Sequence, residues 1–391
     1  MNHIIFGGSL DIRKGGSAGY LANLKVGLDN INATETTIIS NQNTNTTKIP
    51  SGAKSRFSPQ NLDSRVRDFY EAFFVFNYFR RQKHLDRLTS NITIKNEDKL
   101  HFHNIFDYYY SEKRFMSNKK YLTTHTPESI AIEYTNRLKG QHDTEYDFHI
   151  IKNKIRKIEK KVLQNCKNFI YPSKESLEPY YETIPDFDKF IDGKNIHFNM
   201  TGCKELKYKT DKKTFLKLNN IEEDAFIVSF VGRHNKVKGY DVFCEAFNRI
   251  NKIDKKIIFI SAGKGDIDSP SNKQFIDLGW TDDPGSLINA SDVFVLPNNR
   301  TFFDLILLEV LSLGKAVIAS KTGGNKTIAQ LENTGLDLFE KGDIDELVKK
   351  LIHYKENKNK LDEMGKFNRE LYLKYFTLEK FAERYQKILG T

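Results

Sequence analysis

The chain has 391 residues, of which 39% are hydrophobic and 29% charged, and its formal net charge is +10. This length suits two domains of ordinary size, and the composition predicts a soluble globular protein. The longest apolar runs fall far short of the roughly 20 residues that cross a bilayer, so neither a transmembrane helix nor a signal peptide is expected. Cys166, Cys203 and Cys244 lie too far apart for a zinc motif or a disulfide framework, which favours a reducing cytoplasm. The positive charge favours an anionic partner, namely a nucleotide phosphate, an anionic lipid headgroup or a nucleic acid.

Strand and helix signals alternate in the first half of the chain. An apolar strand runs into a loop with several glycines, after which a helical pattern starts. The predicted elements, in order, are a strand at 4–6, a helix at 20–28, a strand at 36–40, a helix at 63–88, strands at 99–102 and 121–124, a helix at 146–166 and a strand at 168–171. A βαβ succession of this kind predicts a parallel sheet.

The pattern breaks down between residues 180 and 224, where polar, lysine-rich sequence shows weak periodicity. We place the interdomain linker there, near residue 200. The prediction is an N-terminal domain at 1–198 and a C-terminal domain at 199–376, with a last helix at 377–391 that returns to the first domain.

The alternation restarts in the second half. The predicted elements are strands at 226–231, 256–262, 275–278, 293–296 and 316–319, with helices at 240–251, 285–290, 305–313, 344–354, 360–375 and 378–389. Two doubly wound α/β domains that face each other across a cleft are therefore the expected architecture.

Two cations follow the strand at 226–231. The strand stops at Gly232 and a helical pattern resumes at Tyr240, so Arg233 and Lys238 fall on the loop at the strand's carboxyl end. Open α/β sheets bind ligands at that end. A guanidinium can hold a diphosphate by paired hydrogen bonds, and a lysine can act as a mobile point charge.

The second half resembles the C-terminal domain of the retaining glycosyltransferases of family 4, which have the GT-B fold of two Rossmann-like domains. The residues that carry the resemblance are Val231 to Arg233 with Lys238 and Gly239, Ser261 to Gly263 with Gly265, Gly279 with Trp280, Ser291 to Pro297, Leu308 and Glu309 with Gly314, and Gly323 with Gly324. Each piece is common by itself, but the ordered set is specific.

The resemblance implies transfer of a sugar from a nucleoside diphosphate, with UDP as the expected carrier and with no cofactor or metal ion. Negative charge develops on the departing phosphate, and Arg233 and Lys238 would stabilise it. By resemblance, the carboxylate of Glu309 accepts hydrogen bonds from the ribose hydroxyls. The residues expected to bind the donor are Gly15, Gly16, Gly263, Trp280, Thr301, Phe302, Phe303, Leu305 and Glu309.

One position departs from the family pattern. A second glutamate usually stands eight residues before Glu309, and this chain has Thr301 there. Asp304 is the candidate to replace its contact with the sugar, while backbone N–H groups of residues 302–305 would still meet sugar and phosphate. An inactive paralogue is the competing explanation. We favour an active enzyme because Arg233, Lys238 and Glu309 are all present.

The first half matches the family less well. Gly15 and Gly16 precede the first helix and resemble the family's glycine-rich loop, although a tight turn explains them equally well. His125 follows a predicted strand where the family keeps a histidine near the transferred sugar, and we count it among the catalytic candidates with Arg233, Lys238 and Asp304. His103 is the other candidate.

The acceptor side is the least defined by the sequence. The predicted helix at 63–88 carries seven aromatic residues followed by a basic cluster, a pattern that suits either the surface of an anionic membrane or packing on the sheet with a solvated basic end. The acceptor is expected to be a glycan or glycolipid, in the cytoplasm or at the inner face of the membrane.

Our prediction is therefore a retaining, metal-independent hexosyltransferase of cell-surface polysaccharide or glycoconjugate synthesis. A nucleotide-sugar epimerase of the same GT-B architecture is the alternative. A basic nucleic-acid-binding protein is a remoter one, because no DNA- or RNA-binding signature accompanies the charge.

Overall fold

The computed structural model describes residues 1–10, 16–40, 63, 65–69, 71–73, 85–89, 92–142 and 145–390. The chain divides into two compact units. Unit 1 holds Met1–Tyr171, Pro179–Asn199 and Glu383–Thr391, and unit 2 holds Pro172–Glu178 and Met200–Ala382. The chain thus passes between the units at residue 200 and again within α16 (Leu378–Gly390), and residues 172–178 pack with unit 2 although they lie within the predicted N-terminal domain.

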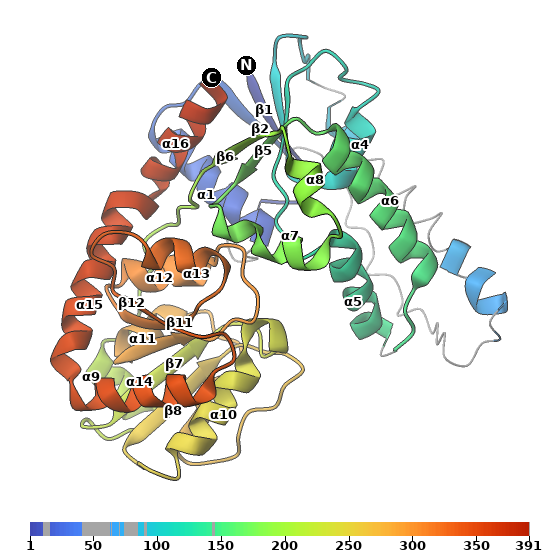
Figure 1. Ribbon diagram of the computed structural model, residues 1–391. Helices are drawn as coiled ribbons and strands as arrows, with labels where there is room; N and C mark the ends of the chain where they lie inside the picture. Colours follow the sequence, from blue (N-terminus) through green and yellow to red (C-terminus); the bar gives the residue numbers. More distant parts are fainter. Residues whose placement is uncertain are drawn as a thin grey trace. The chain divides into compact units, whose positions relative to one another are not determined.

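Unit 1 is built on a six-stranded parallel sheet in the order β2-β1-β3-β4-β5-β6 (Figure 1). The strands are β1 (Asn2–Phe6), β2 (Thr36–Ser40), β3 (Lys99–Phe102), β4 (Lys120–Leu122), β5 (Asn168–Tyr171) and β6 (Asn195–Phe198). The helices are α1 (Gly16–Asn30), α3 (Leu85–Leu88), α4 (Ile105–Ser111), α5 (Ile130–His142), α6 (His149–Asn165), α7 (Glu178–Thr183) and α8 (Phe187–Ile191). Central strands such as β5 are buried throughout, as expected where helices cover both faces of a parallel sheet. Both chain termini belong to this unit.

The predicted breakdown of structure between residues 180 and 224 is wrong. That region contains α8, β6 and, in unit 2, α9 (Lys212–Leu218). These elements have only four to seven residues each, which is too few for a periodic pattern to stand out among lysines and aspartates. Half of the predicted helix at 63–88 lies outside the described residues, and within the described half residues 65–69, 71–73 and 85–88 are helical.

Unit 2 carries a second six-stranded parallel sheet, in the order β12-β11-β10-β7-β8-β9. Its strands are β7 (Phe226–Val231), β8 (Ile257–Ala262), β9 (Phe275–Asp277), β10 (Val293–Leu296), β11 (Ala316–Ser320) and β12 (Leu336–Phe339). Its helices are α9, α10 (Tyr240–Ile250), α11 (Pro284–Ala290), α12 (Leu305–Ser312), α13 (Gly323–Ala329), α14 (Ile344–Glu356) and α15 (Lys358–Leu371), with 3-10 helices η4 (Glu175–Leu177) and η5 (Lys236–Lys238) and a π-helical turn η6 (Tyr372–Phe376). The five strands predicted here are confirmed to within one residue at each end, whereas α13 and β12 were not predicted.

The core of unit 2 lies on both faces of its sheet, because successive residues of β7 point in opposite directions. Phe226, Val228 and Phe230 pack against α10 and α14 on one face. Ile227 packs on the other face with Leu287 of α11. The expectation of two doubly wound α/β domains is confirmed, and each sheet has its own point at which the strand order reverses.

Candidate functional site

In unit 2, the strand order reverses between β7 and β10. The chain leaves β7 toward β8 and β9 and later returns to build β10, β11 and β12 on the opposite side. The loops at the carboxyl ends of β7 and β10 therefore diverge from the point where doubly wound sheets bind their ligands. A backbone hydrogen bond links the two loops: Asn299 N donates to Val237 O at 3.0 Å. Gly239 has a φ of 68°, and a Cβ at that position would lie 1.8 Å from Pro297 O, so only glycine allows this approach.

The close approach of the two loops brings Lys238 to Asp304. Lys238 Nζ donates to Asp304 Oδ1 at 2.6 Å, and Asn298 Nδ2 donates to the second carboxylate oxygen. The Asn235 side chain accepts from Lys238 N at 3.0 Å and shapes the turn from which the lysine projects. Both carboxylate oxygens of Asp304 thus accept hydrogen bonds, and Asp304 positions Lys238. The contact of Asp304 with a sugar stays a prediction.

Arg233, on the same loop, is exposed. Its guanidinium makes no hydrogen bond or ion pair with any residue that the structure describes. Arg233 and Lys238 are therefore neither sealed beneath packed side chains nor both neutralised. One cation is held by a carboxylate and the other is open to an incoming anion.

Glu309 lies in α12, five residues beyond Asp304, and its side chain is half-buried. Burial raises the pKa of this carboxyl to about 7. Within the described part of the chain, no side chain or backbone group donates a hydrogen bond to it. A partly dehydrated carboxylate without donors is costly, and hydroxyl groups of a ligand would relieve that cost.

The loop before α12 buries some of its side chains and leaves others partly exposed. Thr301 is buried with its hydroxyl unpaired among the described residues, and its carbonyl lies where a Cβ on Gly323 would be. Phe303 packs in the core against Phe376, and Leu305 lies against the same cluster. The side chain of Phe303 is therefore a core residue and that of Leu305 is partly buried. The contacts expected of residues 302–305 are those of their backbone N–H groups.

Two further predicted donor residues lie at the carboxyl end of the same sheet. Gly263 follows β8 with a φ of 149°, and a Cβ there would lie 1.8 Å from Gly232 O, so this glycine permits the neighbouring loops to touch. Trp280 follows β9 on a loop and is 70% exposed. It is the single tryptophan of the chain.

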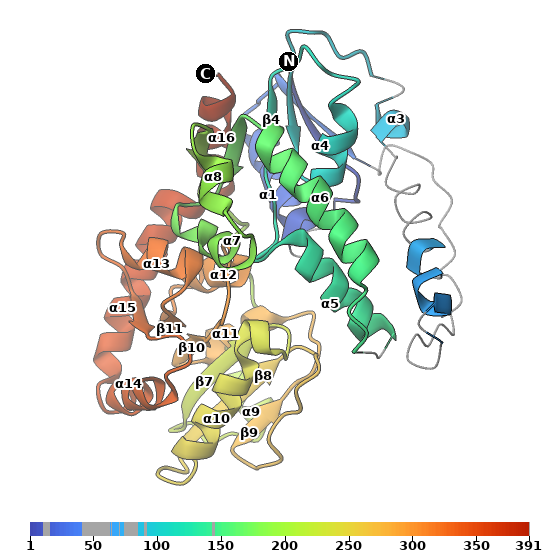
Figure 2. The same cartoon turned by 45° about the vertical axis from the view of Figure 1, so that its right-hand side comes forward.

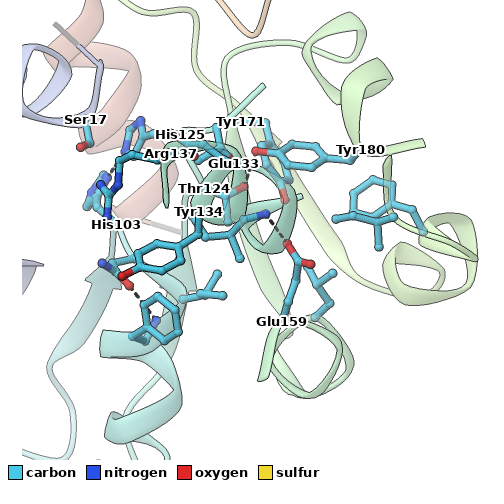
Figure 3. A pocket seen from close by; sticks show the side chains of 18 residues that line it. Ser17, His103, Thr124, His125, Glu133, Tyr134, Arg137, Glu159, Tyr171 and Tyr180 are labelled. Carbon is cyan, nitrogen blue, oxygen red and sulfur yellow. Dashed lines mark hydrogen bonds between the residues drawn. The ribbon is translucent and has the colours of Figure 1, made fainter. Parts of the chain in front are cut away.

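In unit 1, a cavity of about 370 Å³ opens at the carboxyl ends of β3, β4 and β5 (Figure 3). His103 follows β3, and Thr124 and His125 follow β4. The opposite wall comes from α5 and α6, which run side by side in Figures 1 and 2. The lining mixes aromatic rings, hydroxyls and charged groups: Tyr134, Arg137, Glu159, Tyr171 and Tyr180 belong to it. Rings and hydroxyls together suit a sugar, which presents both apolar faces and polar edges.

Both histidine candidates, His103 and His125, line this cavity, and a catalytic role for either stays a prediction. His103 Nδ1 and His125 Nε2 are 2.8 Å apart, and the two rings stack with centroids 5.1 Å apart. Burial lowers the pKa of His125 to about 3 and that of His103 well below its usual value, so both rings are neutral near pH 7. Of the predicted glycine loop, Gly15 lies outside the described residues, and Gly16 is exposed at the start of α1 with a φ of 54°.

The sequence reasoning missed the wall built by Tyr134, Arg137 and Glu159. The Glu159 carboxylate accepts from Ser129 Oγ at 2.6 Å and Ile130 N at 2.8 Å, and so caps the start of α5. For Tyr134 and Arg137 the signal would have been the helical pattern of residues 130–142, which is weakly amphipathic, whereas Glu159 lies within the helix predicted at 146–166.

A three-residue group in unit 1 has the spacing of a metal site. The ligand atoms of Asp68, Glu71 and His149 lie within 4.8 Å of one another. Glu71 already accepts from Tyr146 Oη at 2.6 Å and Ile151 N at 2.9 Å, so its role as a helix-joining acceptor accounts for the cluster. Independence from metal stays a prediction.

Among the described helices, none combines the length and apolar character needed to span a membrane.

Comparison with known proteins finds a family match for one segment of unit 2. Residues 225–357 match the family model described as glycosyl transferases group 1. The chain is 30% identical over 154 residues to the UDP-Gal:alpha-D-GlcNAc-diphosphoundecaprenol alpha-1,3-galactosyltransferase of Escherichia coli. The aligned segment covers 36% of this chain and 40% of the relative. It is 26% identical over 189 residues to the N-acetyl-alpha-D-glucosaminyl L-malate synthase of Bacillus anthracis, covering 46% of this chain and 49% of the relative. The chain therefore spans less than half the length of these curated relatives.

Similarity of structure extends over the whole chain. Anabaena HepE, solved in complex with UDP, matches with a TM-score of 0.62 at 12% identity and 100% coverage of both chains. Sucrose-phosphate synthase from Thermosynechococcus elongatus matches with a TM-score of 0.65 at 16% identity, covering 100% of this chain and 98% of the other. These likenesses confirm the expected GT-B fold.

Proposed function

From the premise that residues 225–357 form a domain of the group 1 glycosyl transferases, we propose that this protein transfers a sugar from a nucleoside diphosphate to a hydroxyl group of an acceptor. Unit 2 binds the nucleotide sugar. The cavity of unit 1 takes a sugar ring of the substrates.

One observation carries the proposal. At the point where the strand order of unit 2 reverses, the loops after β7 and β10 hold Lys238 against Asp304 and leave Arg233 open. A diphosphate that enters can bind Arg233 at once and can draw Lys238 away from Asp304, because two phosphates carry more charge than one carboxylate. The same two cations then stabilise the charge that develops as the sugar departs.

Glu309 supplies the second half of the donor site. Its carboxylate has no hydrogen-bond donor among the described residues, and paired ribose hydroxyls would provide two. Backbone N–H groups of residues 302–305 at the start of α12 complete the contacts, since the side chain of Thr301 is buried.

The chemistry proposed is transfer with retention and without a metal ion. The donor's β-phosphate takes the proton of the incoming hydroxyl, and Arg233 and Lys238 provide the positive charge that a metal would otherwise supply.

The names of the relatives support a finer proposal. One acts with UDP-galactose on a diphosphoundecaprenol-linked sugar, and a structural neighbour binds UDP. We infer a UDP-linked donor and a glycan or lipid-linked acceptor in the synthesis of a surface polysaccharide or glycoconjugate. This assignment places the protein in the cytoplasm, and a lipid-linked acceptor would bring it to an anionic membrane surface.

The test is a fluorescence titration of Trp280 with UDP, GDP and their sugars. Trp280 is exposed on the loop after β9 and is the chain's single tryptophan, so its emission reports on unit 2 alone. We expect saturable quenching by UDP and a loss of affinity of about tenfold or more in Arg233→Ala, since a charged hydrogen bond contributes about 1.5–3 kcal/mol. Lys236→Ala, which removes an exposed cation from the same loop, is the matched control.

Equal affinity of Arg233→Ala and the wild type for every nucleotide would remove the proposed site. Incubation of the protein with a bound nucleotide sugar and no acceptor separates the alternative: an epimerised nucleotide sugar would assign an epimerase in place of a transferase.

A further inference from the structure

Three histidines of unit 1 lie close together at the ends of two neighbouring strands, and two of them, His103 and His125, line the cavity. His101 lies in β3, His103 follows β3, and His125 follows β4. The ring centroids of His101 and His103 are 4.1 Å apart, and those of His103 and His125 are 5.1 Å apart. The hydrogen bonds around them determine where the protons lie.

The proton of His101 is assigned by its neighbours. Thr123 Oγ1 donates its single hydrogen to Ile170 O at 2.7 Å, so the same oxygen can only accept from His101 Nε2 at 2.9 Å. Because burial keeps His101 neutral, its Nδ1 carries a lone pair and accepts from Tyr385 Oη at 2.7 Å. Both ring nitrogens of His101 are thus hydrogen-bonded within the protein, and neither is available to a ligand.

The second pair has one proton to share across the 2.8 Å between His103 Nδ1 and His125 Nε2. His103 Nε2 is buried and has no partner among the residues that the structure describes. If His125 donated, the proton of His103 would have to sit on that Nε2 and leave a buried N–H unpaired. If His103 donates, Nε2 keeps only a lone pair. Orphaned buried N–H groups are the rarer and costlier of the two.

We propose that His103 is a positioning residue that donates from Nδ1 to His125 Nε2 and thereby makes His125 an Nδ1–H donor to a ligand oxygen in the cavity of unit 1. His125 lines that cavity, and its Nδ1 makes no hydrogen bond with the described residues (Figure 3). The edge of Tyr20, with its centroid 4.9 Å away, and the stacked ring of His103 hold its plane.

This arrangement selects among ligands. The single lone pair of His125 is occupied by His103, so His125 cannot act as a general base, and burial disfavours the charged imidazolium. What it offers is one neutral N–H, which recognises an oxygen with a free lone pair. A sugar hydroxyl, ring oxygen or carbonyl oxygen fits, whereas an ammonium group at the same position would meet a donor with a donor. The choice of a sugar as ligand rests on the proposed function, while the polarity of the pair does not.

The polarity is measured directly by ¹⁵N NMR of the histidine rings in the whole protein at pH 7. We expect His125 to show a protonated Nδ1 and a bare Nε2. His103→Asn keeps an amide N–H close to the place of Nδ1 and should preserve this pattern. His103→Leu removes the donor and should release the proton of His125 to either nitrogen. A proton on Nε2 of His125 in the wild type, or a charged ring, would overturn the proposal.

A second readout links the pair to binding. The KM of His103→Asn for the sugar substrate should stay close to the wild-type value. His103→Leu should raise KM about tenfold with little change in kcat, because one neutral hydrogen bond to the substrate is lost. Equal KM in both variants would overturn the positioning role even if both fold. If no donor is turned over at all while His125 carries its proton on Nδ1, the proposed function is refuted and the polarity of the histidine pair stands.

Discussion

The half-buried carboxyl of Glu309 supports a prediction with a defined pH window. Its pKa in the folded protein is about 7 because burial disfavours the charged form, against an ordinary value of 4.5. A raised carboxyl pKa means that the folded state holds the proton more tightly than the unfolded state. Stability is therefore unaffected below about pH 4.5, falls as the pH rises to about 7, and stays low above it.

The size of the effect follows from the shift. The pKa of Glu309 is about 2.5 higher in the folded state than in the unfolded state, which corresponds to a loss of about 3 kcal/mol in the free energy of unfolding at pH 8. Partial exposure of the side chain brings this loss nearer to about 2 kcal/mol. Glu309→Gln removes the charge but keeps the shape, so the variant should be about 2–3 kcal/mol more stable than the wild type at pH 8 and equal to it at pH 4.5. Chemical denaturation followed by far-UV circular dichroism at several pH values measures the difference.

Glu332→Gln is the matched control, because Glu332 is an exposed glutamate of the same unit. We expect no pH-dependent gain from it. If the stability gain of Glu309→Gln over the wild type is no larger at pH 8 than at pH 4.5, the carboxylate is well solvated, and the reasoning about its unmet hydrogen bonds is wrong.

Three further changes test the site and its support. Asp304→Asn removes the negative charge that holds Lys238, so nucleoside diphosphate affinity should rise about fivefold in a Trp280 titration, and a fall would show that Asp304 binds the ligand itself. Gly263→Ala should lower the free energy of unfolding by about 3 kcal/mol or more because its Cβ meets Gly232 O, whereas Gly342→Ala, at a φ of 81° in open space, should cost about 1–2 kcal/mol; equal losses would contradict the clash. Glu159→Ala should cost about 2–3 kcal/mol in thermal or chemical unfolding, since Ser129 Oγ and Ile130 N lose their acceptor, and an unchanged transition would mean that water replaces it.

Local sequence pattern determined most of the elements of unit 2. A strand such as β7 reads directly from its run of β-branched and aromatic residues, and α10 from its apolar period, because both signals arise between residues close in the chain. The same local reasoning placed Arg233 and Lys238 on a loop at a strand's end. It did not find α8, β6 and α9, which are too short to display a period.

The tertiary structure decided which side chains meet. Lys238 pairs with a carboxylate 66 residues away, and His103 bonds a histidine 22 residues away. Both contacts depend on the order of strands in a sheet, which is established by long-range packing and leaves no period in the sequence. For that reason the sequence by itself determined the α/β character and the chemical types at the site, while the closed Lys238–Asp304 pair, the cavity of unit 1 and the proton order of its histidines emerged only from the fold.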